Sequence, residues 1–246
     1  MKRVNKIVLI ILLLILAAML VFIVWAKTPL GPMPEAVAAM QSNLEVEVNV
    51  GDWIEFRPTD NVPQSGFIIY PGGRVDPRSY APIAREIAGQ GYLTAIVPMP
   101  LNLAVFAPNK AEAVIDSHPE ILKWAIGGHS LGGSMAANYA KSKPSEINGL
   151  VFWASYPPRN TDLSEMPLSV SSVYGDLDGL IPVDEILASR DQLPTDTIWV
   201  DIEGGNHAQF GWYGPQPGDN PAMISREEQT LQVVHATTIL LQGIER

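Results

Sequence analysis

The residues that point most directly to chemistry form the pentapeptide Gly128-His129-Ser130-Leu131-Gly132. It directly follows a short apolar run and directly precedes an alanine-rich segment. A serine on a sharp turn from a strand into a helix is held in a strained backbone conformation that exposes its hydroxyl, and small neighbours let the turn close. The glycines at 128 and 132 meet that need. The pattern therefore predicts that Ser130 is a nucleophile.

A serine hydroxyl attacks well only when a base takes its proton and a carboxylate holds that base in the right tautomer. Both groups occur downstream: Asp178 follows an expected strand at 168–175, and His207 follows an expected strand at 196–202. Parallel strands of an open α/β sheet end at one edge, where such sheets build their sites. We therefore expect Ser130, Asp178 and His207 to form a catalytic triad.

Asp176 is an alternative acid in the same loop. A position three residues past Gly175 gives the loop room to return towards the histidine, so Asp178 is preferred and Asp176 is interpreted as a turn former. For a catalytic carboxylate the sequence thus offers two candidates, of which Asp178 is the first.

The other three histidines fit the role of base less well than His207. His129 adjoins the nucleophile, and neighbouring side chains on such a turn point apart, so a structural role is expected for it. His118 lies in an expected loop, and His235 lies in an expected helix that would pack it against the sheet. Only His207 has both the order along the chain and the loop position.

An oxyanion hole needs two backbone N–H groups aimed at the developing negative oxygen. Leu131, the residue after the nucleophile, is expected to supply one. The other is expected from the loop that begins at Tyr70, where Gly72 and Gly73 let the backbone approach a substrate closely. Gly73 is the preferred donor; the alternative is that the two glycines only make a tight turn.

Short apolar runs alternate with amphipathic segments of helical length, which predicts a mostly parallel, doubly wound α/β sheet. A hairpin at 44–50 and 53–58 is expected at a sheet edge. The further expected strands are 66–70, 92–98, 124–128, 147–155, 168–175 and 196–202. The expected helices are 80–90, 109–117, 131–143, 183–191 and 225–243, the last opening with a Ser225–Glu228 capping box.

The chain resembles the compact α/β-hydrolases of the esterase and dienelactone-hydrolase-like type over about residues 64–243. The resemblance rests on the runs GFIIYPGG, GGHSLGG, YGDLDGLIP and GGNHAQF. It implies an α/β-hydrolase fold, a serine nucleophile and hydrolysis of carboxylic esters. Two positions depart from that family: Pro71-Gly72 stands where His-Gly is usual, and Ser130 stands where a dienelactone hydrolase normally has cysteine.

The predicted substrate pocket is open and apolar. Only about a dozen residues, 156–167, join two expected strands where capped hydrolases insert a helical domain, so no cap is expected. Apolar loop residues favour an uncharged acyl or alcohol group. The expected pocket residues are Tyr70, Met99, Leu101, Phe106, Tyr156, Phe210 and Trp212. Ordinary packing of long loops is the alternative interpretation of these side chains.

Carboxylic ester hydrolysis is the favoured activity, on a small-molecule ester substrate. An acyltransferase or perhydrolase would use the same acyl-serine, and a tethered binding protein that has lost catalysis is the alternative from another class. The chain has no cysteine, four histidines and no H-E-x-x-H motif, so neither a metal nor another cofactor is expected.

Residues 1–27 are predicted to form a membrane anchor. The segment 7–26 carries no charge over 20 residues, and a helix of that length spans about 30 Å, the thickness of the hydrocarbon core. Lys2, Arg3 and Lys6 precede it, which favours a cytoplasmic amino terminus and an extracytoplasmic catalytic domain. A cleaved signal peptide is the alternative and would make the protein secreted.

Residues 28–43 follow as a proline-rich spacer that would lift the domain off the membrane, and the hydrolase domain is expected at 44–246. The first 27 residues hold four of the 16 basic residues and no acidic one, which leaves 12 basic against 26 acidic residues beyond them. The resulting net charge of −14 on residues 28–246 disfavours nucleic acid as a partner, because phosphates would be repelled.

Overall fold

A sheet of eight strands forms the centre of the protein in the computed structural model, which describes residues 2–246. Its order is β1-β2-β4-β3-β5-β6-β7-β8, and β3 to β8 run parallel to one another. The strands are β1 Val46–Val50, β2 Ile54–Pro58, β3 Ser65–Tyr70, β4 Leu93–Ile96, β5 Lys123–His129, β6 Gly149–Trp153, β7 Ser169–Gly175 and β8 Ile198–Ile202. The predicted doubly wound, mostly parallel sheet is confirmed.

The hairpin of β1 and β2 closes one edge of this sheet. The two strands pair antiparallel from Val46 opposite Pro58 to Val50 opposite Ile54, and β2 also pairs antiparallel with β4. Alternate residues of β2 are buried, as expected for a strand with one face on the core. The predicted edge hairpin is therefore present.

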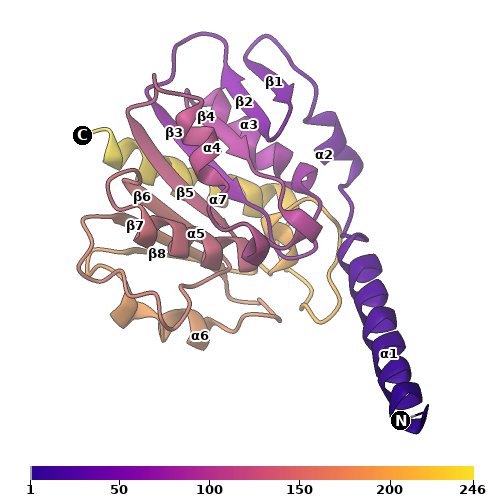
Figure 1. Ribbon diagram of the computed structural model, residues 1–246. Helices are drawn as coiled ribbons and strands as arrows, with labels where there is room; N and C mark the ends of the chain where they lie inside the picture. The colour runs from indigo at the N-terminus through magenta and orange to yellow at the C-terminus, as the bar shows by residue number, and fades with distance from the viewer. Residues whose placement is uncertain (1) are drawn as a thin grey trace.

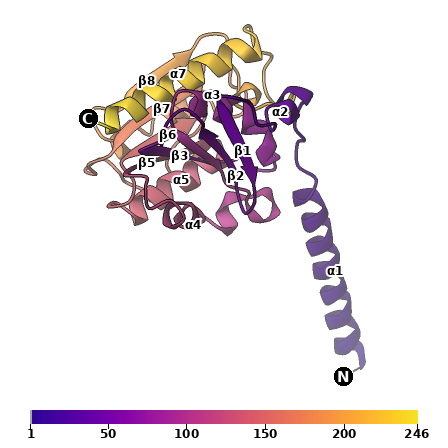
Figure 2. The ribbon, with the colours of Figure 1, turned by 90° about the horizontal axis from the view of Figure 1, so that it is seen from above.

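Helices cover both faces of the sheet (Figure 1). Figure 2 shows α3 (Ala81–Gly89) and α7 (Arg226–Ile244) on one face, with α4 (Ala111–Asp116) and α5 (Leu131–Ser142) on the other. The predicted capping box at the start of α7 is present, with Ser225 Oγ accepting from the Glu228 N–H. The helix expected at 183–191 is interrupted: α6 covers only Val183–Leu187, and a 3-10 turn follows at Arg190–Gln192.

Two apolar cores result, one on each face of the sheet. Strand β3 contributes side chains to both cores, because successive side chains of a strand point to opposite faces. Phe67 and Ile69 pack in the core under α3 and α7, whereas Ile68 and Tyr70 pack in the core under α4 and α5. All six residues of β3 are buried, and this burial holds the strand in place. The proposed oxyanion loop follows directly after its last residue.

The segment between β6 and β7 carries no cap. Residues 154–168 contain neither helix nor strand. This segment of the described chain therefore holds no helical cap domain, as the sequence predicts.

The amino-terminal helix α1 (Lys2–Ala26) projects away from the domain (Figure 1). Its part Lys6–Ala26 is long and apolar enough to cross a membrane, a property that a signal sequence shares. From Lys6 to Trp25 the side chains are exposed, and burial begins only at Ala26, where the helix meets the domain.

The structure differs from the lifting spacer predicted for residues 28–43, because this segment packs along the domain. Leu30 forms a parallel bridge with Val75, and the Met33 N–H donates to the Trp212 carbonyl at 2.8 Å. A short helix, α2 (Pro34–Ala38), follows and buries Ala36 completely. These contacts join residues far apart in sequence, so composition alone did not indicate them.

Candidate active site

Ser130 occupies a strained turn between the last residue of β5, His129, and the first residue of α5, Leu131. Its φ of 52° and ψ of −123° lie in a region that L-residues rarely adopt. The Ser130 N–H donates to the Trp153 carbonyl at 3.0 Å, and the Ser130 carbonyl accepts from Ser155 Oγ at 2.6 Å. These bonds hold the backbone on both sides of the hydroxyl.

Glycine is required beside this serine because the neighbouring strand is too close for a side chain. A Cβ at Gly132 would collide with the backbone carbonyl of Tyr70 and lie 2.5 Å from that of Pro71. A Cβ at Gly128 would meet the Tyr70 carbonyl as well. The two glycines therefore allow the end of β3 and the start of α5 to approach each other, which brings the proposed oxyanion loop beside the serine.

His207 and Asp178 meet at the same edge of the sheet, in the loops that follow β8 and β7. His207 Nδ1 lies 2.7 Å from Asp178 Oδ2, and both side chains are almost completely buried. Asp178 Oδ1 accepts from the N–H groups of Leu180 and Ile181 at 2.8 and 2.7 Å. Both oxygens of the Asp178 carboxylate are therefore hydrogen-bonded, and the bond to Nδ1 fixes the orientation of the imidazole.

The alternative acid, Asp176, does not reach the histidine. Its side chain is exposed, and its Oδ1 accepts from the Gly204 N–H at 2.7 Å. This bond closes the base of the loop that leads to His207, which agrees with a turn-forming role. Of the two carboxylates, only Asp178 contacts the imidazole.

Within residues 2–246, the hydrogen bonds do not include one between Ser130 Oγ and His207. The bond from nucleophile to base is often long in a free enzyme and tightens when substrate binds. The remaining geometry suits that step: His207 has its Nδ1 occupied by Asp178, so its Nε2 is the nitrogen left to accept a proton.

His129 packs directly against His207. Its ring centroid lies 4.4 Å from that of His207 and 5.9 Å from that of Phe210. Complete burial, together with the neighbouring His207, holds the pKa of His129 well below its usual range. His129 is therefore a neutral wall of the site, and it supports the position of the His207 ring.

A hydrogen-bond chain links His129 to the proposed oxyanion loop. The Gly72 N–H donates to the Tyr80 hydroxyl at 2.9 Å, and the same hydroxyl is hydrogen-bonded to His129 Nδ1, also at 2.9 Å. Burial raises the pKa of Tyr80, so its hydroxyl stays protonated. Tyr80 carried no sequence signal for such a role, because 49 residues separate it from His129.

The two proposed oxyanion donors come from neighbouring parts of the structure. A Cβ built on Gly73 would lie 3.3 Å from the Leu131 side chain, so the loop of Gly73 passes close to the start of α5. Over the described part of the chain, neither the Gly73 N–H nor the Leu131 N–H has an acceptor. Both groups are therefore available to a substrate oxygen.

The two remaining histidines lie away from this edge. His118 is buried and pairs with Glu55 on β2, where its Nε2 lies 2.9 Å from Glu55 Oε2. His235 is exposed on α7, so the prediction that it packs against the sheet is wrong. In residues 2–246, no cluster of three or more His, Cys, Asp or Glu side chains could hold a metal ion.

Three of the predicted pocket residues are buried within the domain. The Tyr70 hydroxyl accepts from the Ala111 N–H at 2.8 Å, and Trp212 Nε1 donates to Thr230 Oγ1 at 3.1 Å. Phe210 is fully buried against His129. These side chains pack beneath the surface of the domain and support the loops around Ser130 and His207.

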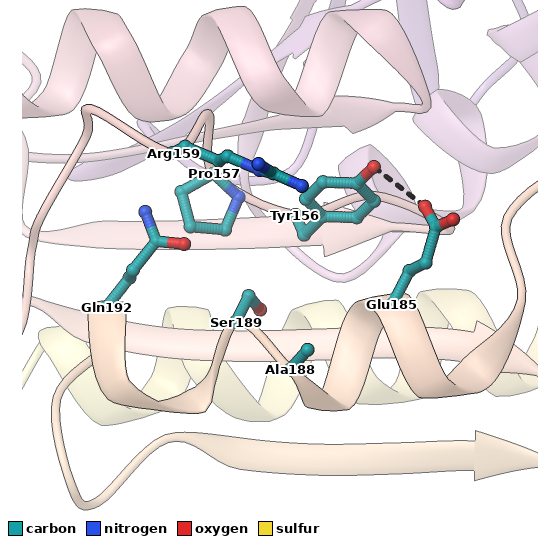
Figure 3. A pocket seen from close by; sticks show the side chains of 7 residues that line it. All are labelled: Tyr156, Pro157, Arg159, Glu185, Ala188, Ser189 and Gln192. Carbon is teal, nitrogen blue, oxygen red and sulfur yellow. Dashed lines mark hydrogen bonds between the residues drawn. The ribbon is translucent and has the colours of Figure 1, made fainter.

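Met99 is a fourth buried member of this set, and the remaining three predicted pocket residues lie nearer to solvent. Leu101 is partly buried in a left-handed turn, and Phe106 is exposed beside Phe22 of α1. Tyr156 lines a cavity of about 300 Å³ against α6, where its hydroxyl donates to Glu185 at 2.9 Å (Figure 3).

Comparison with known proteins agrees with this geometry. Residues 66–231 match the model of the alpha/beta hydrolase family. No curated protein matches the chain. Solved structures share the fold at low sequence identity.

Est1E from Butyrivibrio proteoclasticus superposes with a TM-score of 0.59 at 15% identity, covering 80% of this chain and 99% of that one. A dienelactone hydrolase-like promiscuous phosphotriesterase from metagenomic libraries gives 0.58 at 17% identity, with 78% and 92% covered. An alpha-beta serine hydrolase homologue from Coxiella burnetii gives 0.54 at 16% identity, with 82% and 98% covered. With the family model matching two thirds of its length, this chain belongs to the alpha/beta hydrolase family.

Proposed function

We propose that this hydrolase is a membrane-anchored serine esterase that cleaves carboxylic esters through an acyl-serine intermediate. The observation that carries the proposal is the convergence at one sheet edge of Ser130 on its strained turn with the buried His207–Asp178 pair at 2.7 Å. Ser130 is the nucleophile, His207 the general base and Asp178 the group that orients the base.

The reaction runs in two halves. Ser130 Oγ attacks the ester carbonyl while its proton passes to His207 Nε2, and the N–H groups of Gly73 and Leu131 stabilise the negative oxygen that forms. The bond to the alcohol oxygen then breaks, and the alcohol leaves with the proton from His207. Water, activated by the same histidine, attacks the acyl-serine and releases the carboxylic acid.

The anchor is part of the proposal. The apolar stretch Lys6–Ala26 has the length of a membrane span and exposed side chains, and Lys2, Arg3 and Lys6 favour a cytoplasmic amino terminus. The catalytic domain, residues 44–246, then lies outside the cytoplasm with residues 28–43 packed on it.

A panel of p-nitrophenyl esters of rising acyl chain length tests the activity. Ser130→Ala should remove hydrolysis of every ester, because the attacking atom is lost while little volume changes. Ser142→Ala, a matched change at the far end of α5, should retain the wild-type rates. Equal rates in Ser130→Ala and wild type would refute the proposal.

A further inference from the structure

The end of α1 is fastened to the loop that carries the proposed oxyanion donor. Arg74, the residue after Gly73, donates from Nε to the Trp25 carbonyl at 2.8 Å and from its terminal nitrogen to the Thr28 carbonyl at 2.7 Å. Its guanidinium also lies 4.3 Å from the centroid of the Trp25 ring. Arg74 thus lies at the carboxyl-terminal end of α1, a position that a cation favours.

The loop that contains Asn102 is also hydrogen-bonded to the end of α1. Asn102 Nδ2 donates to the Ala26 carbonyl at 2.9 Å, and the Asn102 carbonyl accepts from the Arg74 N–H at 2.8 Å. Both Arg74 and Asn102 have positive φ, at 57° and 53°. The hydrogen bonds of Arg74 and Asn102 therefore attach two loops of the domain to the end of α1.

The packed segment 28–43 reinforces this attachment. The Leu30 N–H donates to the Arg74 carbonyl at 2.7 Å, and the Asp76 N–H donates to the Leu30 carbonyl at 2.9 Å. A domain held this way cannot swing on a free linker. Its surface at the end of α1 stays at the level where the helix leaves the bilayer.

That surface is apolar where it meets the helix. Phe106 is 52% exposed and Val105 46% exposed, both in the turn Ala104–Phe106. The ring of Phe106 lies edge-on to that of Phe22, at 6.4 Å between centroids. Phe22 is four residues before the end of α1, about 6 Å deeper along the helix axis. Phe106 therefore reaches the depth of residues that lie inside the membrane.

A cavity of about 520 Å³ lies between the end of α1 and the proposed oxyanion loop. Its lining includes Trp25 and Leu30 on the anchor side and Gly73, Arg74 and Leu103 on the catalytic side. Ser130 does not line it, but Gly73 does, and a Cβ built on Gly73 would lie 3.3 Å from the Leu131 side chain, next to the proposed nucleophile. The cavity thus joins the end of α1 to one of the proposed oxyanion donors.

We infer that the substrate is an uncharged long-chain acyl ester dissolved in the bilayer, which reaches Ser130 from the membrane side through the cavity beside Gly73. The inference rests on the proposed function and specifies its substrate class. The net charge of −14 on residues 28–246 favours an uncharged ester over an anionic lipid. Trp25 at the cavity mouth suits the interface between hydrocarbon and water.

The test uses the full-length protein in phosphatidylcholine vesicles with two probes: p-nitrophenyl butyrate in the water phase and methylumbelliferyl palmitate dissolved in the same vesicles. The measured quantity is the ratio of the palmitate rate to the butyrate rate. Val105→Asp should lower this ratio about five- to tenfold, because a carboxylate resists entry into the edge of the hydrocarbon region. Val62→Asp is the matched control, since Val62 is 76% exposed in the loop before β3, at the amino-terminal end of that strand. Its ratio should equal that of wild type.

An equal ratio in the two variants and wild type would overturn the inference. A second measurement needs no variant: the palmitate ester should be cleaved faster in the enzyme's own vesicles than in separate vesicles without protein, and equal rates would overturn the inference. Wild-type protein that cleaves butyrate but not the vesicle-borne ester would also overturn it while leaving the proposed function intact. Failure to cleave either ester would refute the proposed function itself.

Discussion

Asp178→Asn tests how the site sets the tautomer of its base. Both carboxylate oxygens are used in the structure: Oδ2 lies 2.7 Å from His207 Nδ1, and Oδ1 accepts from the N–H groups of Leu180 and Ile181. The side chain is completely buried, so water cannot replace any of these partners.

The asparagine amide can sit in this site in only one favourable way. Its oxygen must face the N–H groups of Leu180 and Ile181, because the reverse orientation leaves two buried donors unpaired at about 1–3 kcal/mol each. The amide NH₂ then faces His207 Nδ1, which has to become an acceptor. The ring proton moves to Nε2, the nitrogen that should receive the proton of Ser130. We expect kcat to fall about 10⁴-fold, equivalent to roughly 5 kcal/mol.

The assay is the steady-state hydrolysis of p-nitrophenyl butyrate, with thermal unfolding measured on the same samples to show that the fold is kept. Asp176→Asn is the matched control in the same loop, because Asp176 is exposed and accepts only from the Gly204 N–H. Its kcat should fall by a few-fold at most. A folded Asp178→Asn enzyme with nearly wild-type kcat, or an equally large loss in Asp176→Asn, would refute the assignment of the acid.

Two further predictions concern stability. Gly132→Ala should destabilise the domain by about 3 kcal/mol or more in urea unfolding, because its Cβ would collide with the Tyr70 carbonyl, whereas Gly243→Ala, with open space around it, should be neutral or slightly stabilising. Glu55→Gln should cost about 1–3 kcal/mol at pH 5.5, because the hydrogen bond within the buried pair lowers the pKa of Glu55 to about 2 and raises the pKa of His118. The contribution of His118 is complete below its unfolded pKa of about 6.5 and is lost as the pH rises through its higher folded pKa, so the difference from wild type should shrink at pH 9; a difference independent of pH would contradict this pairing.

Local signals in the sequence were sufficient for the fold and for the order of the candidate catalytic residues. The pentapeptide around Ser130 contains the glycines that its sharp turn requires, since Gly128 and Gly132 leave room for the neighbouring strand β3. The positions of Asp178 and His207 follow from the rule that loops after parallel strands share one edge. Both kinds of signal lie within a few residues of the group that they place.

Contacts between distant parts of the chain could not be predicted in this way. The bond between Arg74 and the Trp25 carbonyl joins residues 49 apart, and that between Asn102 and the Ala26 carbonyl joins residues 76 apart. The composition of residues 28–43 indicated a free spacer, whereas contacts of this kind hold the segment on the domain. The packing of His129 against His207 and its hydrogen bond with Tyr80 were hidden for the same reason, because both join parts of the chain that are distant in sequence.

The central claim is that Ser130 is the nucleophile, and the most direct measurement is the site of covalent modification by a fluorophosphonate. The full-length protein is labelled, digested, and its peptides are analysed by mass spectrometry, with Ser142→Ala and Ser130→Ala treated in parallel. We predict one adduct, on Ser130, in wild type and in Ser142→Ala, and no adduct in Ser130→Ala. An adduct on a different serine, or an active protein that does not react, would contradict the account.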